Sequence, residues 1–543
     1  MARKTAAKPA ATEAKPAKKE KTPKTQQPLS LESVLWNCRN ALRGTVGGNE
    51  KNRDAVMGLV FLKFAGEKFE KRRAEIQKEY GDTFLEKDSF YRSKSVFYIS
   101  EKARWSYIVT NASKDDIAVI LDKAMADIED RNPPLKGALP QNFYATLGTR
   151  KEQIKGLIDE INNIDEAHFQ DKDLIGRVYE YFLQVFAIDA GTGEKGEFYT
   201  PASLVQLIAE LIEPYSGIVY DPCCGSGGMF VQSIKFVERH NGNRTKISVV
   251  GQESNPDTWR LAKMNLAIRG INNNLGDLAT STFTDDCHKD IKVNYIMANP
   301  PFNLKNWRNS DELNDDYRFR GYEIPPVSNA NYGWILHMLS KLDVTNGIAG
   351  FLLANGALNA DGVEGEIRKK LIENDKVEAI IVLPREMFYS TDISVTLWII
   401  NNNKKAHVLN NRKNCDRTGK VLFVDLRRWN DNIYEKKYVR FSDEQISQIK
   451  KIYTSWQTGR GYKDIPELCK SASLEEIKTK NYSLAPSKYI EFIDHDLEID
   501  YKTEMKRIQK EMKKILQAEK ESQKMLEKAF KGIGFSITGE RSR

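Results

Sequence analysis

Residues 217–228, Gly-Ile-Val-Tyr-Asp-Pro-Cys-Cys-Gly-Ser-Gly-Gly, join a short apolar run that ends at Asp221 to a glycine-rich turn. The residues from Met229 to Arg239 then follow a helical pattern. This order predicts a strand, a turn and a helix, in which glycines let the backbone approach a ligand and the helix N-terminus offers free N–H groups. The turn does not match Gly-x-Gly-x-x-Gly, so by itself it is also compatible with a tight turn that binds nothing.

Strands and helices continue to alternate after this turn. A helix is predicted over 258–269, and short apolar runs predict strands at 247–251, 294–298, 348–353, 377–383 and 395–400. The alternation predicts a doubly wound α/β domain with a mainly parallel sheet. We expect this domain to occupy residues 164–480 and to begin with an amphipathic helix over 164–190.

The N-terminal segments have a different pattern. Residues 1–28 are rich in Ala, Lys, Pro and Thr and contain no aromatic residue, which predicts a disordered basic tail. Weak attraction of this tail to nucleic acid is the alternative. Residues 29–163 have helical periodicity, with Ser30 as the expected N-cap of the first helix and a break at 132–134, and predict an all-α domain.

The last segment, residues 481–543, contains one long charged helix predicted over 500–531. Its apolar seam alternates spacings of four and three, with Glu519 and Ser522 as two polar members. The apolar members are Tyr501, Met505, Ile508, Met512, Ile515, Leu526 and Ala529. This partial coiled-coil pattern suggests a helix that docks on a partner, and the alternative is a helix folded back onto its own chain.

Composition narrows the class of protein. The 543 residues contain no run of about 20 apolar residues and no apolar leader core, so neither a membrane segment nor secretion is expected. Six cysteines without a Cys-x-x-Cys pair fit a reducing cytoplasm. Six scattered histidines predict no metal site, and no Gly-x-x-x-x-Gly-Lys-Ser/Thr motif indicates an ATP-driven motor. Residues 1–26 carry +6 of the net charge of +8, so any contact with DNA must be local or shared with a partner.

Two polar positions follow later strands of the α/β domain. Glu253 comes after the second strand, about 25–30 residues past the glycine-rich turn, where an acid is well placed for ribose hydroxyls. Because Asp221 would repel phosphate, a nucleoside without a diphosphate fits better than a dinucleotide. Asn299-Pro300-Pro301-Phe302 follows the strand at 294–298. Its amide oxygen, the stiffened carbonyl of Pro300 and the flat ring of Phe302 together suit an exocyclic amino group on an unstacked base.

These motifs, in this order, resemble the N6-adenine DNA methyltransferase family, and specifically the modification subunit of type I restriction–modification systems. The resemblance covers roughly residues 30–490. It includes Lys-Gly-Glu-Phe-Tyr-Thr-Pro at 195–201, Met-Asn-Leu-Ala-Ile-Arg-Gly at 264–270, Leu-Leu-Ala-Asn-Gly-Ala-Leu at 352–358 and Leu-Pro-Arg-Glu-Met-Phe-Tyr at 383–389. It implies a Rossmann-like domain that binds S-adenosylmethionine.

The resemblance also implies roles for individual residues. The cofactor-binding set comprises Glu197, Phe198, Tyr199, Thr200, Pro201, Ala202, Asp221, Ser226, Gly227, Gly228, Glu253 and Asp277. Within it, Glu253 would bind the ribose, Asp221 the cofactor's amino group and Asp277 its adenine. Asn299 and the Pro300 carbonyl would hold the target amino group, next to Pro301, and Phe302 would stack on a flipped adenine. Cys223 and Cys224 depart from the family's usual residues, but a thiol is small, so we expect binding to survive.

The implied reaction needs positioning more than acid–base chemistry, because the sulfonium methyl carbon is already electrophilic. The family also implies partners: double-stranded DNA, a separate specificity subunit, a second copy of this chain and a motor-nuclease restriction subunit. Two alternatives remain. The chain could methylate RNA or a protein glutamine amide, since Asn-Pro-Pro also serves there, or it could be a non-catalytic clamping subunit.

Overall fold

The computed structural model describes seven stretches of the chain, residues 30–42, 48–164, 174–190, 200–388, 394–434, 438–493 and 501–532. The tail predicted at 1–28 lies outside these residues. So do Glu197, Phe198 and Tyr199 of the expected cofactor-binding set. Within the described ranges, no helix combines the length and the apolar character needed to cross a membrane.

The N-terminal part is helical, as predicted. Its helices are α1 (Leu31–Ala41), α2 (Gly48–Tyr80), α3 (Asp88–Arg92), α4 (Trp105–Asn111), α5 (Ile117–Arg131) and α6 (Lys151–Asn162), with 3-10 turns η1 (Asp82–Phe84), η2 (Glu101–Ala103) and η3 (Pro133–Leu135). Ser30 caps α1 as expected, because its side chain accepts a hydrogen bond from the Ser33 N–H. The expected break at Asn132 ends α5.

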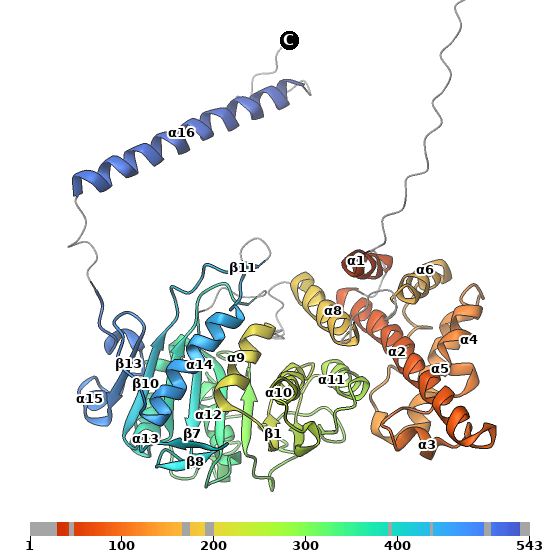
Figure 1. The fold of residues 1–543 in the computed structure, drawn as a ribbon, viewed down its shortest axis with the longest axis horizontal. Coiled ribbons are helices and arrows are strands. Elements are labelled where there is room, and N and C mark those ends of the chain that lie inside the picture. The colour runs from red at the N-terminus through yellow and green to blue at the C-terminus, as the bar shows by residue number, and fades with distance from the viewer. Residues whose placement is uncertain are drawn as a thin grey trace, which may run out of the picture.

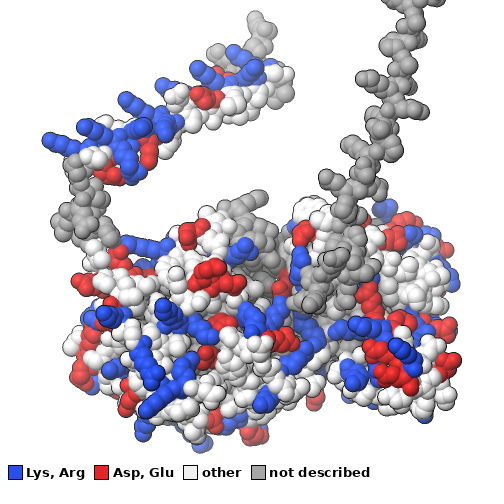
Figure 2. Space-filling model, in the orientation of Figure 1, with Lys and Arg blue, Asp and Glu red and all other residues white. Residues whose placement is uncertain are grey.

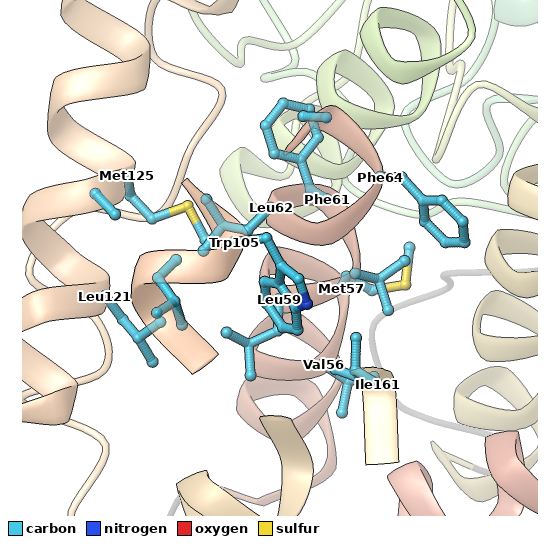
Figure 3. Packing of buried hydrophobic residues seen from close by; sticks show 14 of the residues in the cluster. Val56, Met57, Leu59, Phe61, Leu62, Phe64, Trp105, Leu121, Met125 and Ile161 are labelled. Carbon is cyan, nitrogen blue, oxygen red and sulfur yellow. The ribbon is translucent and has the colours of Figure 1, made fainter. Parts of the chain in front are cut away.

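Helix α2 is the centre of this helical part. Its apolar run at 55–65 is buried at every position, Lys63 included, so the helix is covered on all sides. Figure 3 shows its side chains between Trp105 of α4, Met125 of α5 and Ile161 of α6. A helix that is apolar all round must lie in the middle of its neighbours, which explains why this part forms a core of its own.

The helix expected over 164–190 is observed as α8 (Leu174–Ala190). Its buried side chains, Val178 and Phe182 among them, belong to the same apolar cluster as α2. Leu261 and Met264 of α11 (Pro256–Ile268) join this cluster. The helical part and the α/β part therefore share an apolar contact through α8 and α11 (Figure 1).

The α/β part is built on one nine-stranded sheet in the order β13-β10-β6-β7-β5-β4-β1-β2-β3. The strands of the whole part are β1 (Gly217–Asp221), β2 (Ile247–Gly251), β3 (Asn273–Asn274), β4 (Tyr295–Ala298), β5 (Ile348–Ala354), β6 (Val377–Val382), β7 (Val395–Asn401), β8 (His407–Leu409), β9 (Arg412–Asn414), β10 (Lys420–Asp425), β11 (Ile433–Tyr434), β12 (Tyr438–Val439) and β13 (Cys469–Ser473). In the large sheet, β7 and β13 run antiparallel to their neighbours and the other pairs are parallel. The remaining four strands form two small hairpins.

Helices cover both faces of this sheet. The helices and 3-10 turns of the α/β part are α9 (Ala202–Ile212), α10 (Gly228–Arg239), η4 (Arg244–Lys246), α11, η5 (Tyr317–Phe319), α12 (Asn331–Lys341), η6 (Asn355–Leu358), α13 (Gly362–Glu373), α14 (Asp443–Thr458), α15 (Leu474–Thr479) and η7 (Pro486–Lys488). Successive strand residues point to opposite faces. Val219 of β1 belongs to the apolar cluster that includes residues of α9, α10, α11 and α14, whereas Tyr220 belongs to the cluster that includes residues of α12, α13 and α15. The predicted doubly wound architecture is confirmed.

The winding changes direction between β1 and β4, which are hydrogen-bonded neighbours. The chain leaves β1 through α10 on one face and leaves β4 through α12 on the other. Ligands of open α/β sheets bind at this kind of switch point, beyond the carboxyl ends of the strands. Asp221 ends β1 and Asn299 follows β4, so the two motifs singled out in the sequence lie at the switch point.

The C-terminal segment divides into two unlike parts. Leu484 and Tyr489 are buried, and the Tyr489 ring stacks on Phe423 of β10 with ring centres 4.1 Å apart. After residue 500, α16 (Tyr501–Gly532) stands away from the body and buries none of its residues (Figure 1). The long helix predicted from the sequence is therefore present, and it does not fold back onto its own chain.

A pair of glycine substitutions tests the packing around α2. A Cβ at Gly58 would lie 2.5 Å from the Tyr144 hydroxyl oxygen and 3.0 Å from the Met125 methyl group. Gly58→Ala is therefore expected to lower the free energy of unfolding by about 1–3 kcal/mol, despite the better helix propensity of alanine. Gly156→Ala in α6 is the control, because a Cβ there meets nothing within 4 Å and should stabilise by up to about 1 kcal/mol. Denaturant unfolding of both variants measures this, and equal effects would contradict the packing.

Candidate active site

Asp221 lies at the base of the glycine-rich turn. Its side chain is 1% exposed, and its carboxylate accepts a hydrogen bond of 3.0 Å from the Cys223 N–H. Burial raises the pKa of this carboxyl from 3.8 to about 7, and the Glu253 carboxylate acts in the same direction, against the hydrogen bonds from Cys223. A buried carboxylate with so few donors is suited to a cationic or amino ligand and not to a phosphate.

The turn itself is open above its backbone. Gly225 and Gly227 have φ angles of +53° and +81°, a conformation that favours glycine. A Cβ built at Gly225 or Gly228 meets no atom of the described residues within 4 Å, so the backbone of the turn is accessible at these two positions. Asn265 of α11 holds the turn in place, because its side-chain amide donates a hydrogen bond to the Ser226 carbonyl oxygen at 2.8 Å. The turn thus offers a ligand an exposed backbone and the N-terminus of α10.

Glu253 borders the same turn. One of its carboxylate oxygens accepts from the Gly225 N–H at 3.0 Å, and the other accepts from the Asn255 N–H at 2.8 Å. The Ser254 hydroxyl also donates to this second oxygen, at 3.4 Å. Asp277 is exposed on the loop after β3, and this loop joins Glu253 through the Thr280 N–H, which donates to the Glu253 carbonyl at 3.0 Å.

Asn299 follows β4 on the other side of the switch point. Its amide nitrogen donates to the Thr200 hydroxyl at 2.9 Å, which joins residues 99 positions apart. Its amide oxygen Oδ1 is buried and has no hydrogen-bond partner among the described residues. Because a buried polar atom without a partner costs free energy, this oxygen is a candidate acceptor for a donor group of a ligand.

Phe302 is half-buried beside Phe388, with ring centres 6.0 Å apart and ring planes at 88°. Pro300 is buried and Pro301 partly buried, so the backbone between the amide and the ring is held in place. Phe302 packs against the cluster on the α9 face of the sheet. The amide oxygen and an aromatic ring are thus supplied by four consecutive residues.

The structure brings most of the expected residues to one edge of the sheet. Pro201 and Ala202 begin α9 directly after Thr200, and Pro201 is buried. Three contributors were not predicted: Asn265, Asn255 and Phe388. A signal for Asn255 was present, since asparagine before proline is typical of a helix N-cap, and Asn255 caps α11. In the described residues, no group of three or more His, Cys, Asp or Glu side chains could hold a metal ion.

Comparison with known proteins agrees with this geometry. The model of the N-6 DNA methylase family matches residues 170–497, more than half of the chain. This chain belongs to the N-6 DNA methylase family. The model of the HsdM N-terminal domain matches residues 31–161, which correspond to the helical part. The chain is therefore an adenine-specific DNA methyltransferase subunit of a type I restriction–modification system. The resemblance seen in the sequence is confirmed.

Relatives of this methylase subunit match most of its length. It is 34% identical to the type I restriction enzyme MjaIX methylase subunit of Methanocaldococcus jannaschii, over 93% of this chain and 92% of the relative. It is 42% identical to the HindI methylase subunit of Haemophilus influenzae, over 69% of this chain and 83% of the relative. The solved methyltransferase subunit of the Streptococcus thermophilus type I system has the same fold, with a TM-score of 0.70 at 24% identity over 84% of this chain and 98% of that chain.

Replacing Asp221 of the methylase subunit by asparagine tests the buried carboxyl. Because its folded pKa lies above the unfolded value, the native carboxyl binds an extra proton between about pH 4 and pH 7, and stability falls as the pH rises through this range. Asp221→Asn removes this loss. The free energy of unfolding of the variant minus that of the wild type should therefore be about 2 kcal/mol higher at pH 8 than at pH 5.

Denaturant unfolding at the two pH values measures this difference. The exposed Asp277→Asn is the control, for which no such pH-dependent difference is expected. A stability difference for Asp221→Asn that is the same at pH 5 and pH 8 would contradict the assigned burial.

Proposed function

We propose that this methylase subunit transfers a methyl group from S-adenosylmethionine to N6 of an adenine flipped out of double-stranded DNA, at sites chosen by a separate specificity subunit. The observation that carries the proposal is Oδ1 of Asn299, which is buried and has no hydrogen-bond partner among the described residues. The amide nitrogen of Asn299 donates a hydrogen bond to the Thr200 hydroxyl, and this bond fixes the orientation in which the amide oxygen can accept. An exocyclic amino group supplies the donor that this oxygen lacks.

The residues around the glycine-rich turn fit the cofactor. Bound S-adenosylmethionine supplies a methyl carbon made electrophilic by its sulfonium. Glu253, fixed by two backbone N–H groups, would accept from the ribose hydroxyls, and the buried Asp221 would accept from the amino group. The open space over Gly225 and Gly228 leaves room for a ligand at the backbone.

Further residues complete the proposed cofactor site. These are residues 197–202 and 226–228 for the methionine part and Asp277 for the adenine.

The target base would lie across the switch point from the cofactor. Asn299 Oδ1 and the Pro300 carbonyl would accept the two amino protons, and the Phe302 ring would stack on the base. These hydrogen bonds localise the nitrogen lone pair and aim it at the methyl carbon, which is catalysis by positioning. A base reaches such a pocket only outside the stack, at a cost of a few kcal/mol.

The proposal is tested by methyl transfer from labelled S-adenosylmethionine to DNA, with this chain alone and with its specificity subunit. Activity only in the mixture supports delegated sequence recognition. Activity of the chain alone would contradict the delegation. No transfer to DNA in either case, together with transfer to RNA or to a protein, would replace DNA as the substrate.

Replacing Asn299 by alanine should separate catalysis from cofactor binding. Methyl transfer is expected to fall by about two to three orders of magnitude, as for other lost hydrogen bonds to a reacting group. The affinity for S-adenosylmethionine, measured by calorimetry, should change less than about twofold, because Asn299 is proposed to hold the base only. Asn346→Ala, an exposed asparagine before the amino end of β5, is the control and should keep full activity. Loss of cofactor binding in Asn299→Ala would overturn the assigned roles.

We further propose that α16 docks on the specificity subunit in a complex that also holds a second copy of this chain and, in the full system, the restriction subunit. The helix contains ten Lys or Arg and five Glu, and Figure 2 shows its cationic surface. The apolar stripe is exposed: Met512, Ile515 and Leu526 are 60%, 67% and 51% exposed. An exposed apolar stripe of this length is typical of a helix that associates with another protein.

Substitution on the stripe tests the docking. Met512→Asp together with Ile515→Asp should abolish co-elution with the specificity subunit in size-exclusion chromatography, because two carboxylates would enter an apolar contact. Lys513→Asp, on the opposite side of the helix, is the matched control and should still co-elute. Unchanged assembly of the double variant would contradict this role of α16.

A further inference from the structure

The segment after Phe302 has a rigid shape of its own. We call residues 303–330, between Phe302 and α12, the insert. Asn331 closes its base, since its Oδ1 accepts from the Asn303 N–H at 3.0 Å and its Nδ2 donates to Asn303 Oδ1 at 2.9 Å. The buried Arg308 holds the interior by donating to the carbonyl oxygens of Asn309, Ser310, Glu312 and Pro325 at 2.9–3.1 Å. The insert is therefore held together internally by hydrogen bonds, and it directly follows the Asn299–Phe302 loop.

Arg318 anchors the insert to a different loop. This is the β3–β4 loop, residues 275–294, which carries Asp277. The Arg318 guanidinium is 5% exposed and donates to the carbonyl oxygens of Thr282 at 2.9 Å and Phe283 at 2.6 Å. Asp316 orients it through two hydrogen bonds of 2.7 Å. A planar fork with five donors can satisfy all these acceptors at once, which a lysine cannot do.

Thr282 carries the connection on to the glycine-rich turn. It is 4% exposed, and its hydroxyl donates to the Pro222 carbonyl at 2.5 Å. Pro222 lies between Asp221 and Cys223, where the turn begins. A chain of three residues thus joins the insert to the backbone that is proposed to hold the cofactor.

A second branch reaches the same strand end. The Arg318 guanidinium also contacts Nδ1 of His337 at 3.3 Å, and His337 Nε2 lies 2.9 Å from the Tyr220 hydroxyl. Burial, together with the neighbouring Arg318 and Lys341, lowers the pKa of His337 to about 3, so the neutral ring can accept from Arg318 and donate to Tyr220. Tyr220 immediately precedes Asp221. Both branches therefore end within two residues of the buried carboxylate.

We propose that Arg318 is a positioning residue that couples the Asn299–Phe302 loop to the cofactor-binding turn through Thr282 and Pro222. The inference rests on the proposed function, because it takes the turn as the cofactor site and Asn299 as the base-binding group. Substitution of Arg318 or Thr282 should then weaken cofactor binding, although neither residue is among the proposed ligands of the cofactor.

The experiment uses the complex with the specificity subunit and measures the Kd for S-adenosylmethionine by calorimetry without DNA. Thr282→Val keeps the shape of the side chain and removes the hydroxyl, and it should raise this Kd about five- to tenfold with little change in Tm. Thr282→Ser keeps the hydroxyl and should restore the Kd to within about twofold of the wild type. Arg318→Lys should raise the Kd at least as much and also lower kcat about tenfold.

The double variant shows whether Thr282 and Arg318 act through the same series of hydrogen bonds. If they do, Thr282→Val combined with Arg318→Lys should raise the Kd by less than the product of the two single effects. A Kd for Thr282→Val equal to that of the wild type, or equal losses for Thr282→Val and Thr282→Ser, would overturn the coupling.

Failure of the proposed function is distinguishable from failure of the coupling. The proposed function fails if the Asn299→Ala variant stays active or if the wild-type complex does not methylate DNA. The coupling is measured by cofactor binding alone.

Discussion

The pairing of β1 with β4 places one constraint on everything at the site. The two strands are parallel neighbours, and the chain leaves them toward opposite faces of the sheet. The connections that follow them therefore diverge, from Asp221 at the end of β1 and from Asn299 after β4. Asn299 donates a hydrogen bond to Thr200, which lies just before α9, and this bond fixes the orientation of the amide. The proposed cofactor and base sites thus follow neighbouring strands of one sheet edge.

Two buried polar groups at this edge of the sheet have few or no hydrogen-bond donors from the described residues. Asp221 is buried with its pKa raised to about 7, and Asn299 Oδ1 is buried without a partner among the described residues. Each costs stability in the protein alone, and each is suited to a ligand group of a particular kind. Destabilised polar groups of this kind are concentrated at functional sites. In contrast, the Arg318 guanidinium and both ring nitrogens of His337 have hydrogen-bond partners, and they link the loops around the site.

The distribution of charge fits a division of labour between subunits. The N-terminal tail and α16 both carry an excess of Lys and Arg, and the residues between them carry no net positive charge. Such a body is poorly equipped to hold a polyanion alone. A partner that reads the DNA sequence and docks on the apolar stripe of α16 would supply further contacts to the DNA.

The doubly wound fold, the helical N-terminal part and the long C-terminal helix were predictable from the sequence, because strand, turn and helix signals are local. The same holds for Asp221, Glu253 and Asn299, which stand directly after apolar strands. The pairing of Asn299 with Thr200 was not predictable in this way, since the two residues are 99 positions apart and no local pattern joins them. The placement of α8 in the helical core, the open space over Gly225 and the connection from Arg318 to Pro222 also depend on contacts between distant segments. The sequence by itself therefore determined which groups are present and at which strand ends, because periodicity and turn residues act over a few positions. Only the tertiary structure decided which acceptor stays unpartnered and which arginine holds the loops, because hydrogen-bond satisfaction depends on what the whole fold brings together.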